Sequence, residues 1–327
     1  MKALAFHRYG PVAVLGIEDV AVPAPAPGEV RVRVAYAGLN AFDWHQYTGR
    51  PLVMRGREGW RVREPRILGA DFAGTVDAVG EGVEGVAVGD RVMGSNGRGA
   101  LAEWVTAPTD RLAVVPAGVT VAQAAALPMA GVTALQALRD IGAMKPGESV
   151  LVWGASGGVG HLAVQLARAL GASRVDAVCS GRNVAMIRGL GADAVADYTT
   201  NERPPGGYDL VVDLVATQSL RSLRTLLTDG GRVVTVGGVA NGLFLGPGRS
   251  IIRRVALSRL HGVAHAMFVA DVTSDDLQAL GVLAAEGQVR AMVHRIAPFD
   301  ESREACAELE AGHVRGKLVV EVDPSQG

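Results

Sequence analysis

The chain has 327 residues, of which 49% are hydrophobic and 20% charged, and its formal net charge is −1 at pH 7. This composition is typical of a globular protein and excludes an intrinsically disordered one. No basic block stands out, so we expect neither nucleic acid nor an anionic membrane as a partner. The length exceeds what one hydrophobic core usually serves, which predicts two domains.

The cysteine content and the N-terminus indicate the compartment. Cys179 and Cys306 are the two cysteines of the sequence, too few for a disulfide framework or a thiolate zinc site. The first residues, MKALAFHRYG, lack the long apolar core and small-residue cleavage site of a signal peptide. No uninterrupted apolar run reaches the roughly 18 residues of a membrane-spanning helix. We therefore expect a soluble cytoplasmic protein.

The first 120 residues are predicted to form a compact β-rich module. The segments KALAFHRY, EVRVRVAYAG and FAGTVDAVG alternate or run apolar and are rich in β-branched residues, which favours strands. VAVPAPAPGE is too rich in proline for a helix and is interpreted as an extended connector. VEGVAVGDRVMG and LAEWVTAPTDRLAVVP continue the strand pattern.

Near residue 121 the pattern changes to alternating helices and strands. An Ala- and Leu-rich helix, broken at Pro128, precedes the strand SVLVWGA, the helix GVGHLAVQLARALGA and the strand RVDAVCS. The helix NVAMIRGLGA, the strands AVADY and YDLVVDLVA, the helix SLRSLRTLLTDGG and the strand RVVTVGG follow. Such alternation predicts a doubly wound parallel sheet.

The last third of the chain is predicted to return to the first module. IIRRVALSRLHGVAHAMFVA is interpreted as a helix leading into a strand, and SDDLQALGVLAAEGQV as a helix with a Ser or Asp cap. The tail then forms strand, helix and strand. We predict one domain from residues 1–121 and 290–327, and a second from residues 122–289.

A glycine-rich turn is the strongest local signal. Gly154, Gly157 and Gly160 lie three apart between a predicted strand and a predicted helix. The first allows a tight turn, Gly157 allows the backbone to approach a pyrophosphate, and Gly160 allows helix and strand to pack closely. Ala155 stands at the first position of a strict G-x-G-x-x-G pattern, so the prediction of a dinucleotide site depends on the flanking elements. The alternative is a glycine-rich turn without a ligand.

The end of the second strand of this unit indicates which dinucleotide binds. NAD-binding proteins usually place an acid there for the ribose hydroxyls, whereas this strand ends in Ser180, Arg182 and Asn183. Asp176 lies earlier, inside the strand. A hydroxyl and a guanidinium suit a 2′-phosphate, which predicts NADPH. The alternative for Arg182 is a solvated residue at a helix start.

Seven segments resemble the medium-chain dehydrogenase/reductase superfamily, most closely its zinc-free quinone oxidoreductase branch (zeta-crystallin-like). The resemblance implies a GroES-like β module plus a Rossmann domain, an α/β architecture, with the active site in the cleft between them. The segments are AGLNAFD (37–43), LGADFAGTVDAVG (68–80), VGDRVMG (88–94), AAALPMAGVTALQAL (124–138), GASGGVG (154–160), CSGRNVAMIRGLGAD (179–193) and GKLVVEV (316–322).

The resemblance also implies that no metal is bound. Zinc-dependent relatives have Cys in place of Asn40 and a His-Glu pair in place of Ala70 and Asp71, and their four-cysteine lobe is replaced by MGSNGRGALAEW. A catalytic zinc needs three Cys, His or carboxylate ligands. Asp43, His45 and Asp71 are the side chains that could in principle be assembled into such a site.

Four residues of the 37–49 stretch are implied in catalysis. Asn40, together with Thr133, is expected near the nicotinamide, and Asp43 is expected to orient its neighbours. His45 falls where relatives often place Tyr or Lys facing the substrate, and a His can donate to a carbonyl oxygen or relay a proton. Tyr47 is a second candidate donor. The alternative for His45 and Tyr47 is a surface or packing role.

Further contacts with the dinucleotide are implied by the same match. They are expected at the pyrophosphate (Ala155, Ser156, Gly157, Gly158, Val159), beside the adenine (Tyr198), along the carboxyl edge of the sheet (Val215, Ala216, Gly237, Gly238), after the last strand (Phe268, Val269) and at the closing side of the cleft (Lys317).

The segment 50–67 combines several arginines with Leu52, Met54 and Trp60. Loops on a rigid scaffold often carry specificity, so one interpretation is a lid over an apolar acceptor. A solvated surface excursion is the alternative, and the arginines also suit an anionic substrate such as an acyl-CoA.

The resemblance implies an NADPH-dependent reductase of quinones or enones that works without zinc. Such acceptors delocalise the charge left by hydride addition, so the protein mainly aligns the reactants and offers hydrogen-bond donors. The alternatives are a zinc-free carbonyl or alcohol oxidoreductase and a non-enzymatic NADPH-binding protein. A homodimer formed through the edge strand around HGVAHAMFV is the expected assembly.

Overall fold

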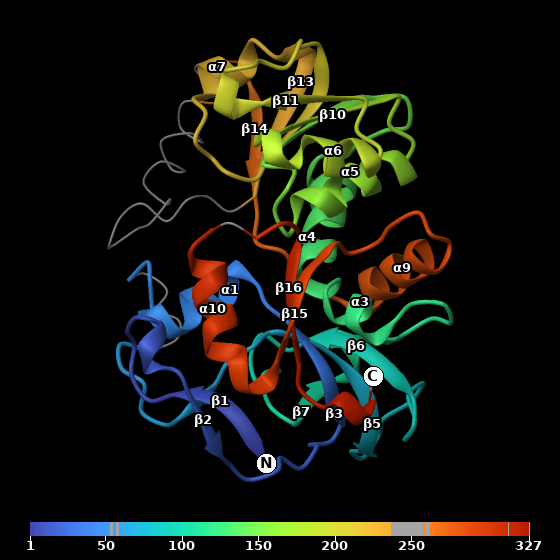
Figure 1. The fold of residues 1–327 in the computed structure, drawn as a ribbon. Coiled ribbons are helices and arrows are strands. Elements are labelled where there is room, and N and C mark those ends of the chain that lie inside the picture. The colour runs from blue at the N-terminus through green and yellow to red at the C-terminus, as the bar shows by residue number, and fades with distance from the viewer. Residues whose placement is uncertain (53–54, 57–58, 237–257, 259–261, 313, 327) are drawn as a thin grey trace. The chain divides into compact units, whose positions relative to one another are not determined.

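The computed structural model describes residues 1–327 apart from 53–54, 57–58, 237–257, 259–261, 313 and 327 (Figure 1). The chain divides into two compact units. The β-rich unit comprises Met1–Val132, Val272–Gly287 and Ala291–Gly327, and the parallel-sheet unit comprises Thr133–Asp271 and Gln288–Arg290.

A seven-stranded sheet forms the centre of the β-rich unit, in the order β15-β16-β3-β5-β6-β8 with β7 also paired to β3. Val30, Val32 and Val34 are fully buried while the arginines between them are partly exposed, as the alternating sequence predicts. The strands are β3 (Glu29–Gly38), β5 (Asp71–Val79), β6 (Arg91–Ser95), β7 (Trp104–Pro108), β8 (Leu112–Val114), β15 (Val293–Pro298) and β16 (Lys317–Glu321).

A smaller sheet and several α-helices belong to this part of the chain as the structure describes it. The small sheet has the order β2-β1-β4. Its strands are β1 (Lys2–Phe6), β2 (Gly16–Asp19) and β4 (Arg66–Ile67), and the helices are α1 (Ala41–Thr48), α3 (Val121–Ala125), α4 (Pro128–Gln136), which runs on into the parallel-sheet unit, α9 (Ser274–Ala285) and α10 (Ser302–Glu310).

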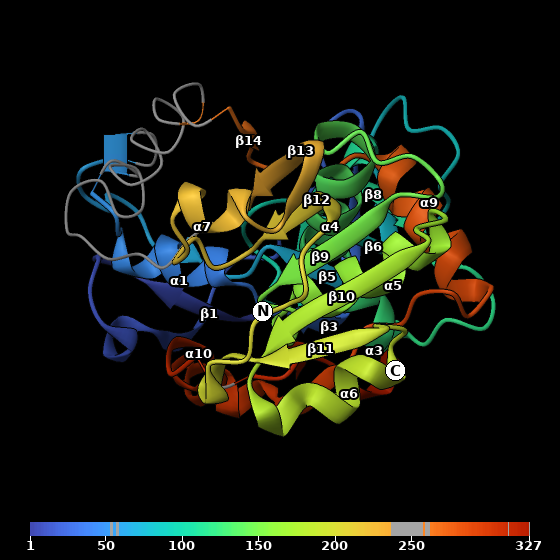
Figure 2. The same cartoon turned by 90° about the horizontal axis from the view of Figure 1, so that it is seen from above.

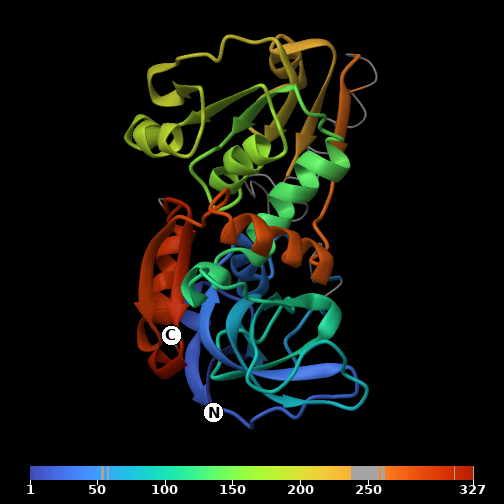
Figure 3. The ribbon, with the colours of Figure 1, turned by 90° about the vertical axis from the view of Figure 1, so that its right-hand side faces the viewer.

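The C-terminal tail returns to the β-rich unit, as predicted. β16 pairs antiparallel with β3 and parallel with β15, which places the last strand inside the sheet. Figure 3 shows this tail in red, with α10 beside β15 and β16.

The division of the chain differs from the predicted boundaries near residues 121 and 289. Helix α3 packs on β3 so closely that a Cβ on Gly38 would lie 2.1 Å from the Ala125 carbonyl oxygen. Helix α9 packs over β6 and β8, where Gly281 faces Pro116 and Met93. Both helices therefore belong to the β-rich unit, because their apolar faces are buried there.

Among the described residues of the parallel-sheet unit, six strands form a sheet in the order β11-β10-β9-β12-β13-β14, and all of them are parallel (Figure 2). The order reverses between β9 and β12, which confirms a doubly wound sheet. The elements are β9 (Ser149–Trp153), α5 (Gly160–Ala169), β10 (Arg174–Cys179), α6 (Val184–Gly189), β11 (Ala194–Asp197), β12 (Tyr208–Asp213), α7 (Leu220–Arg224), β13 (Leu227–Thr235) and β14 (Ala264–Met267), with a π-helical turn at Ala137–Ile141.

Helix α7 is shorter than predicted. It ends at Arg224, and the following LTDGG opens β13, where Leu227 pairs with Tyr208. The left-handed Gly230 (φ 83°) belongs to this strand. Pairing with β12 therefore overrides the helical spacing of the leucines. The helix predicted in the first part of IIRRVALSRLHGVAHAMFVA (251–270) falls largely outside the described residues.

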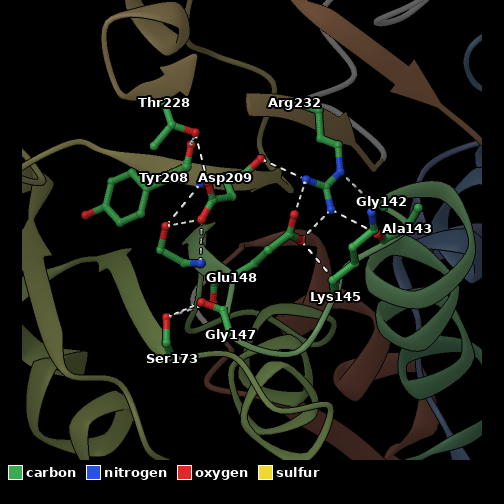
Figure 4. Close-up of polar contacts among 11 residues, drawn as sticks. Gly142, Ala143, Lys145, Gly147, Glu148, Ser173, Tyr208, Asp209, Thr228 and Arg232 are labelled. Carbon is green, nitrogen blue, oxygen red and sulfur yellow. Dashed lines mark hydrogen bonds and ion pairs between the residues drawn. The ribbon is translucent and has the colours of Figure 1, made fainter. Parts of the chain in front are cut away.

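Polar contacts tie together the amino ends of the central strands (Figure 4). Arg232 binds Glu148 at 2.6 Å and the carbonyl oxygen of Asp209 at 3.1 Å. The Asp209 carboxylate accepts hydrogen bonds from the Ser149 amide at 2.9 Å and the Thr228 hydroxyl at 2.8 Å. This network lies at the edge opposite to the glycine-rich turn, so its role is structural.

Candidate active site

Helix α1 presents the polar stretch 37–49 from the end of β3. Asn40 is the N-cap residue, with extended backbone (φ −133°), and the Asp43 carboxylate accepts its amide N–H at 2.7 Å. This pairing of N-cap and third helical residue begins the helix. Gly49, left-handed at φ 58°, ends it. Asp43 thus fixes the backbone of Asn40.

The Asn40 carboxamide is held from both ends inside the β-rich unit. Its Nδ2 donates to Asp71 Oδ2 at 2.9 Å and to the Gly38 carbonyl at 3.3 Å, and its Oδ1 accepts from the Lys317 ammonium. Asn40 is 8% exposed. Its contact with the nicotinamide stays a prediction. In the structure, both ends of the carboxamide form hydrogen bonds with buried groups of the β-rich unit.

Asn40, Asp43, Asp71 and Lys317 form what we call the buried charge cluster. Asp71 is fully buried at the start of β5 and also accepts the N–H of Met129 at 3.1 Å, so it caps the first turn of α4. Lys317 Nζ lies 3.8 Å from Asp71 Oδ2. Lys317 was expected to close a cleft; instead its side chain is 2% exposed and points into this cluster.

Burial governs the protonation of the cluster. It raises the pKa of Asp43 to about 7, and repulsion from Asp71 adds to the rise. Burial likewise raises the pKa of Asp71 and lowers that of Lys317, while the attraction between the two groups opposes both shifts. Two carboxylates and one ammonium carry a net charge of −1, so protonation of Asp43 neutralises the cluster.

His45 is half-buried and engaged on one side. Its Nδ1 donates to the Arg50 carbonyl at 2.6 Å, and its ring meets Trp44 edge-on at 4.9 Å between centroids. Burial lowers the His45 pKa. The neutral ring with its proton on Nδ1 leaves Nε2 as an acceptor, so donation to a substrate requires prior protonation.

Tyr47 is a packing residue, which corrects its interpretation as a donor to substrate. It is 1% exposed within the hydrophobic core of the β-rich unit, and its hydroxyl donates to Glu310 of α10 at 3.2 Å. Burial raises the pKa of the Tyr47 hydroxyl above its usual value. The periodicity of α1 turns position 47 inward, which the polar character of the stretch obscured.

Two arginines of the 50–67 segment hold it on the β-rich unit. The Arg55 guanidinium lies 4.5 Å from the Tyr9 ring and donates to the Gly49 carbonyl at 3.0 Å, at the carboxyl end of α1. Arg66 donates to the Tyr9 hydroxyl at 3.3 Å. Trp60 is 68% exposed. The lid and the anionic-substrate interpretations stay predictions; Met54 falls outside the described residues.

The glycine turn has the geometry that a dinucleotide site needs. Gly154 is left-handed (φ 89°), and a Cβ on Gly160 would lie 2.3 Å from its carbonyl oxygen, which confirms the close packing of strand and helix. A Cβ on Gly157 would meet nothing nearer than 3.6 Å. The chain is therefore open at Gly157, where a phosphate is expected. Ala155 is buried, and Ser156, Gly158 and Val159 are partly exposed.

At the tip of β10 the expected side chains take different roles. Arg182 is exposed and Ser180 partly exposed, whereas Asn183 is 3% exposed and donates to the Ser180 hydroxyl at 3.1 Å. Asn183 thus supports Ser180. Asp176 accepts the Tyr208 hydroxyl at 2.7 Å, which confirms that it stays inside the strand.

Sequence reasoning missed Asp197, the last residue of β11. Its Oδ2 would lie 2.3 Å from a Cβ on Gly181, so it lies directly beside the β10 tip. Hydrogen bonds from the Thr199 side chain and amide lower its pKa. The parallel pairing of Cys179 with Asp197 was the available signal, because it brings the two strand ends together.

The remaining expected contacts lie as follows. Thr133, on α4, is 8% exposed. Tyr198 is 59% exposed beyond β11, and Val269 is 87% exposed, two residues past β14. Val215 and Ala216, at the carboxyl end of β12, and Phe268 are partly exposed, whereas Gly237 and Gly238 fall outside the described residues.

Known proteins match almost the whole chain. Residues 26–117 match the alcohol dehydrogenase GroES-like domain, and residues 190–320 match the zinc-binding dehydrogenase family. A chloroplast envelope quinone oxidoreductase homolog of Arabidopsis thaliana is 34% identical over 340 residues, covering 98% of each chain. The chain belongs to the medium-chain dehydrogenase/reductase superfamily. The GroES-like and Rossmann assignments of the two units are thereby confirmed.

Two further relatives of this medium-chain dehydrogenase/reductase are informative. The quinone oxidoreductase from Coxiella burnetii superposes with a TM-score of 0.86 at 32% identity, covering 99% of both chains. An NADPH-dependent alkenal/one oxidoreductase of Arabidopsis thaliana is 32% identical, covering 98% of this chain and 79% of its own. The chain is therefore an oxidoreductase of the quinone oxidoreductase branch, using a nicotinamide cofactor and a small-molecule substrate.

The donor set of this medium-chain dehydrogenase/reductase does not fit a catalytic zinc. Among the described residues, no three His, Cys, Asp or Glu side chains gather as metal ligands. The buried charge cluster instead holds an amide and an ammonium beside its carboxylates, whereas zinc needs Cys, His or carboxylate ligands. Membrane association was a separate question. In the part of the chain that the structure describes, no helix is long and apolar enough to cross a membrane. The cytoplasmic location and the formation of a homodimer stay predictions.

Proposed function

We propose that this protein is an NADPH-dependent, zinc-independent reductase of quinones or α,β-unsaturated carbonyl compounds. The observation that carries the proposal is the buried charge cluster, in which the Lys317 ammonium lies against Asp71 and Asn40. A resident side-chain cation there balances the acidic charge that a metal would otherwise balance. The named activities of the relatives support the same acceptor class.

The chemistry of such acceptors needs little from the protein besides alignment. When bound, NADPH would supply the hydride for a new C–H bond at the β-carbon of an enone. The C=C π pair would then form the C=C bond of an enolate, and the carbonyl π pair would move to oxygen. A proton from solvent then completes the reduction at the α-carbon. The charge is delocalised throughout, so no strong electrophile is required.

Contacts within the β-rich unit support a positioning role for several residues in that step. Lys317 and Asp71 fix the Asn40 carboxamide, and Asp71 also fixes the first turn of α4, the helix that carries Thr133. His45 offers Nε2 as a proton acceptor or, once protonated, as a donor. The roles of Asn40, Thr133 and His45 at the nicotinamide belong to this proposal.

The β10 tip supports NADPH over NADH. Ser180 and Arg182 offer a hydroxyl and a guanidinium, which suit a phosphate. Asp176 is turned away and bound to Tyr208. Asp197 is engaged by Thr199, with its Oγ1 at 2.7 Å and its amide at 2.9 Å, so this acid serves the turn that follows β11.

The test is oxidation of NADPH and NADH against a 1,4-quinone, a short enone and a saturated ketone of similar size, each with and without a chelator. We expect chelator-insensitive turnover of the quinone or enone, with higher kcat/KM for NADPH. Reduction of the ketone alone would indicate a carbonyl reductase. Tight NADPH binding without turnover would indicate a binding protein, and loss of activity to the chelator would refute zinc independence.

A further inference from the structure

Strand β12 ends in a buried carboxylate that the proposed mechanism does not use. Asp213 is fully buried, and it pairs with Trp153 of β9 on one side and Thr235 of β13 on the other. A buried carboxylate is unfavourable unless its oxygens accept hydrogen bonds. Its Oδ1 accepts the amide N–H groups of Val215 at 3.2 Å and Ala216 at 2.9 Å.

The turn closed by these two bonds has a backbone that its sequence disfavours. Ala216 has a φ of 59°, in the left-handed region that residues with a Cβ rarely adopt. Such a conformation persists only when its surroundings hold it in place. Here the two hydrogen bonds to the Asp213 carboxylate hold it.

The same turn packs against the glycine turn. A Cβ on Gly154 would lie 2.6 Å from Val215 Cγ2, and the Leu214 amide donates to the Trp153 carbonyl at 3.0 Å. The turn after β12 and the glycine turn after β9 therefore leave the sheet side by side. They do so where the strand order reverses, which is where ligands bind in doubly wound sheets.

We propose that Asp213 is a positioning residue of the dinucleotide site. Its carboxylate fixes the Val215–Ala216 turn, and Val215 in turn holds the glycine turn at Gly154, so both backbone surfaces are ready before the cofactor arrives. Asp213 itself touches no cofactor. The inference rests on the proposed function, which supplies the identity of the cofactor.

The first test compares Asp213→Ala with a matched control at the other end of the same strand. The dissociation constants of NADPH and NADH are measured by fluorescence titration, and thermal unfolding is recorded for each variant. We expect Asp213→Ala to raise the NADPH dissociation constant about tenfold, the equivalent of one or two lost hydrogen bonds. Asp209→Ala, which breaks the network of Figure 4, should lower Tm and leave NADPH binding unchanged.

A second-site change separates positioning from general destabilisation. Glycine adopts the left-handed region without strain, so Ala216→Gly added to Asp213→Ala should recover most of the lost affinity. A merely structural Asp213 would give no such recovery. If Asp213→Ala is not obtained as folded protein, Ala216→Val tests the turn alone, because a β-branched side chain opposes a positive φ; it should also raise the dissociation constant.

Four results would overturn the inference: wild-type affinity in folded Asp213→Ala, no recovery of affinity when Ala216→Gly is added to it, wild-type affinity in Ala216→Val, or an equal loss of affinity in Asp209→Ala. A wild-type protein that binds neither dinucleotide would overturn the proposed function as well, which distinguishes the two failures.

Discussion

At the scale of single residues, the buried charge cluster explains why Asn40 and Asp43 of the polar stretch 37–49 are buried: they are hydrogen-bonded within this cluster. A lysine ammonium is almost never fully buried unless it is paired, and Lys317 finds its partners in Asn40 and Asp71. The cluster joins the end of β3 and the starts of β5 and β16 to the starts of α1 and α4. Its stability and its protonation are therefore properties of the site.

Replacement of Lys317 by methionine should strongly destabilise the β-rich unit. Removing one partner of a buried ion pair leaves an uncompensated charge and typically costs about 3–5 kcal/mol. Asp71→Asn in the same chain should restore part of that loss, because it removes the orphaned carboxylate. Arg315→Met, at an exposed position two residues away, is the control and should match wild type in urea unfolding. An unchanged midpoint for Lys317→Met would contradict the pairing.

The raised pKa of Asp43 predicts how stability depends on pH. The folded protein holds this proton up to about pH 7, whereas the unfolded chain releases it near 3.8. The folded state thus binds more protons between these values, so this contribution to stability is complete below pH 3.8 and is lost as pH rises through 7.

Asp43→Asn isolates that contribution, since the amide cannot ionise and its oxygen can still accept the Asn40 N–H. The unfolding free energy of the variant relative to wild type should rise between pH 4 and pH 7.5 by a few kcal/mol, at about 1.4 kcal/mol per unit of pKa shift. Denaturant titrations across this range measure the difference. A difference that is constant with pH would mean that Asp43 is ionised throughout.

At the scale of elements, two glycines of the glycine turn meet different structural requirements, although they belong to one sequence motif. Gly160 lacks a side chain because α5 packs against the Gly154 carbonyl, whereas the position of Gly157 is open. One glycine serves the packing of strand and helix, and the other is free to serve a ligand.

Gly160→Ala should therefore lower stability, whereas Gly157→Ala should weaken cofactor binding. Gly160→Ala places a methyl group 2.3 Å from the Gly154 carbonyl oxygen, and such overpacking typically costs about 1–3 kcal/mol. Gly157→Ala should leave Tm close to wild type but raise the NADPH dissociation constant, because the methyl group occupies the approach of the phosphate. Thermal unfolding and cofactor titration of both variants check this; equal Tm losses would contradict it.

At the scale of the whole molecule, local patterns predicted most of the elements and the return of the tail to the β-rich unit, but not that α3 and α9 belong to that unit. The alternation in EVRVRVAYAG and the glycine turn specify their own strands, since each depends on neighbouring residues. The assignment of α3 and α9 to the β-rich unit depends on which sheet buries their apolar faces. That choice involves contacts between segments distant in sequence, such as Gly281 with Met93.

The candidate site shows the same division between local and distant information. Asn40 and Asp43 were expected at the site through the family resemblance, and the structure places them three residues apart at the start of α1. Tyr47 was misread because its partner, Glu310, lies 263 positions along the chain. Lys317 was expected at the site, but its partners come from other strands, so its buried pairing with Asn40 could not be derived from spacing. An aspartate within the apolar run LGADFAG was the available signal, because a buried carboxylate needs a partner.

The grouping makes the β-rich unit depend on the last residues of the chain. β16 lies between β15 and β3, and its Leu318, Val319 and Val320 are fully buried. At about 1.5–3 kcal/mol for each buried side chain, the free energy lost by their removal is comparable to the whole stability of a domain.

Two truncated chains test this dependence. A chain ending at residue 314 also lacks Lys317, so we expect it to lose cooperative unfolding of this unit. A chain ending at Asp323 keeps β16 and the Arg33–Asp323 ion pair of 2.6 Å, and should unfold like wild type in calorimetry. If the shorter chain unfolds like wild type, β16 is not needed for the stability of the sheet, which would contradict this prediction.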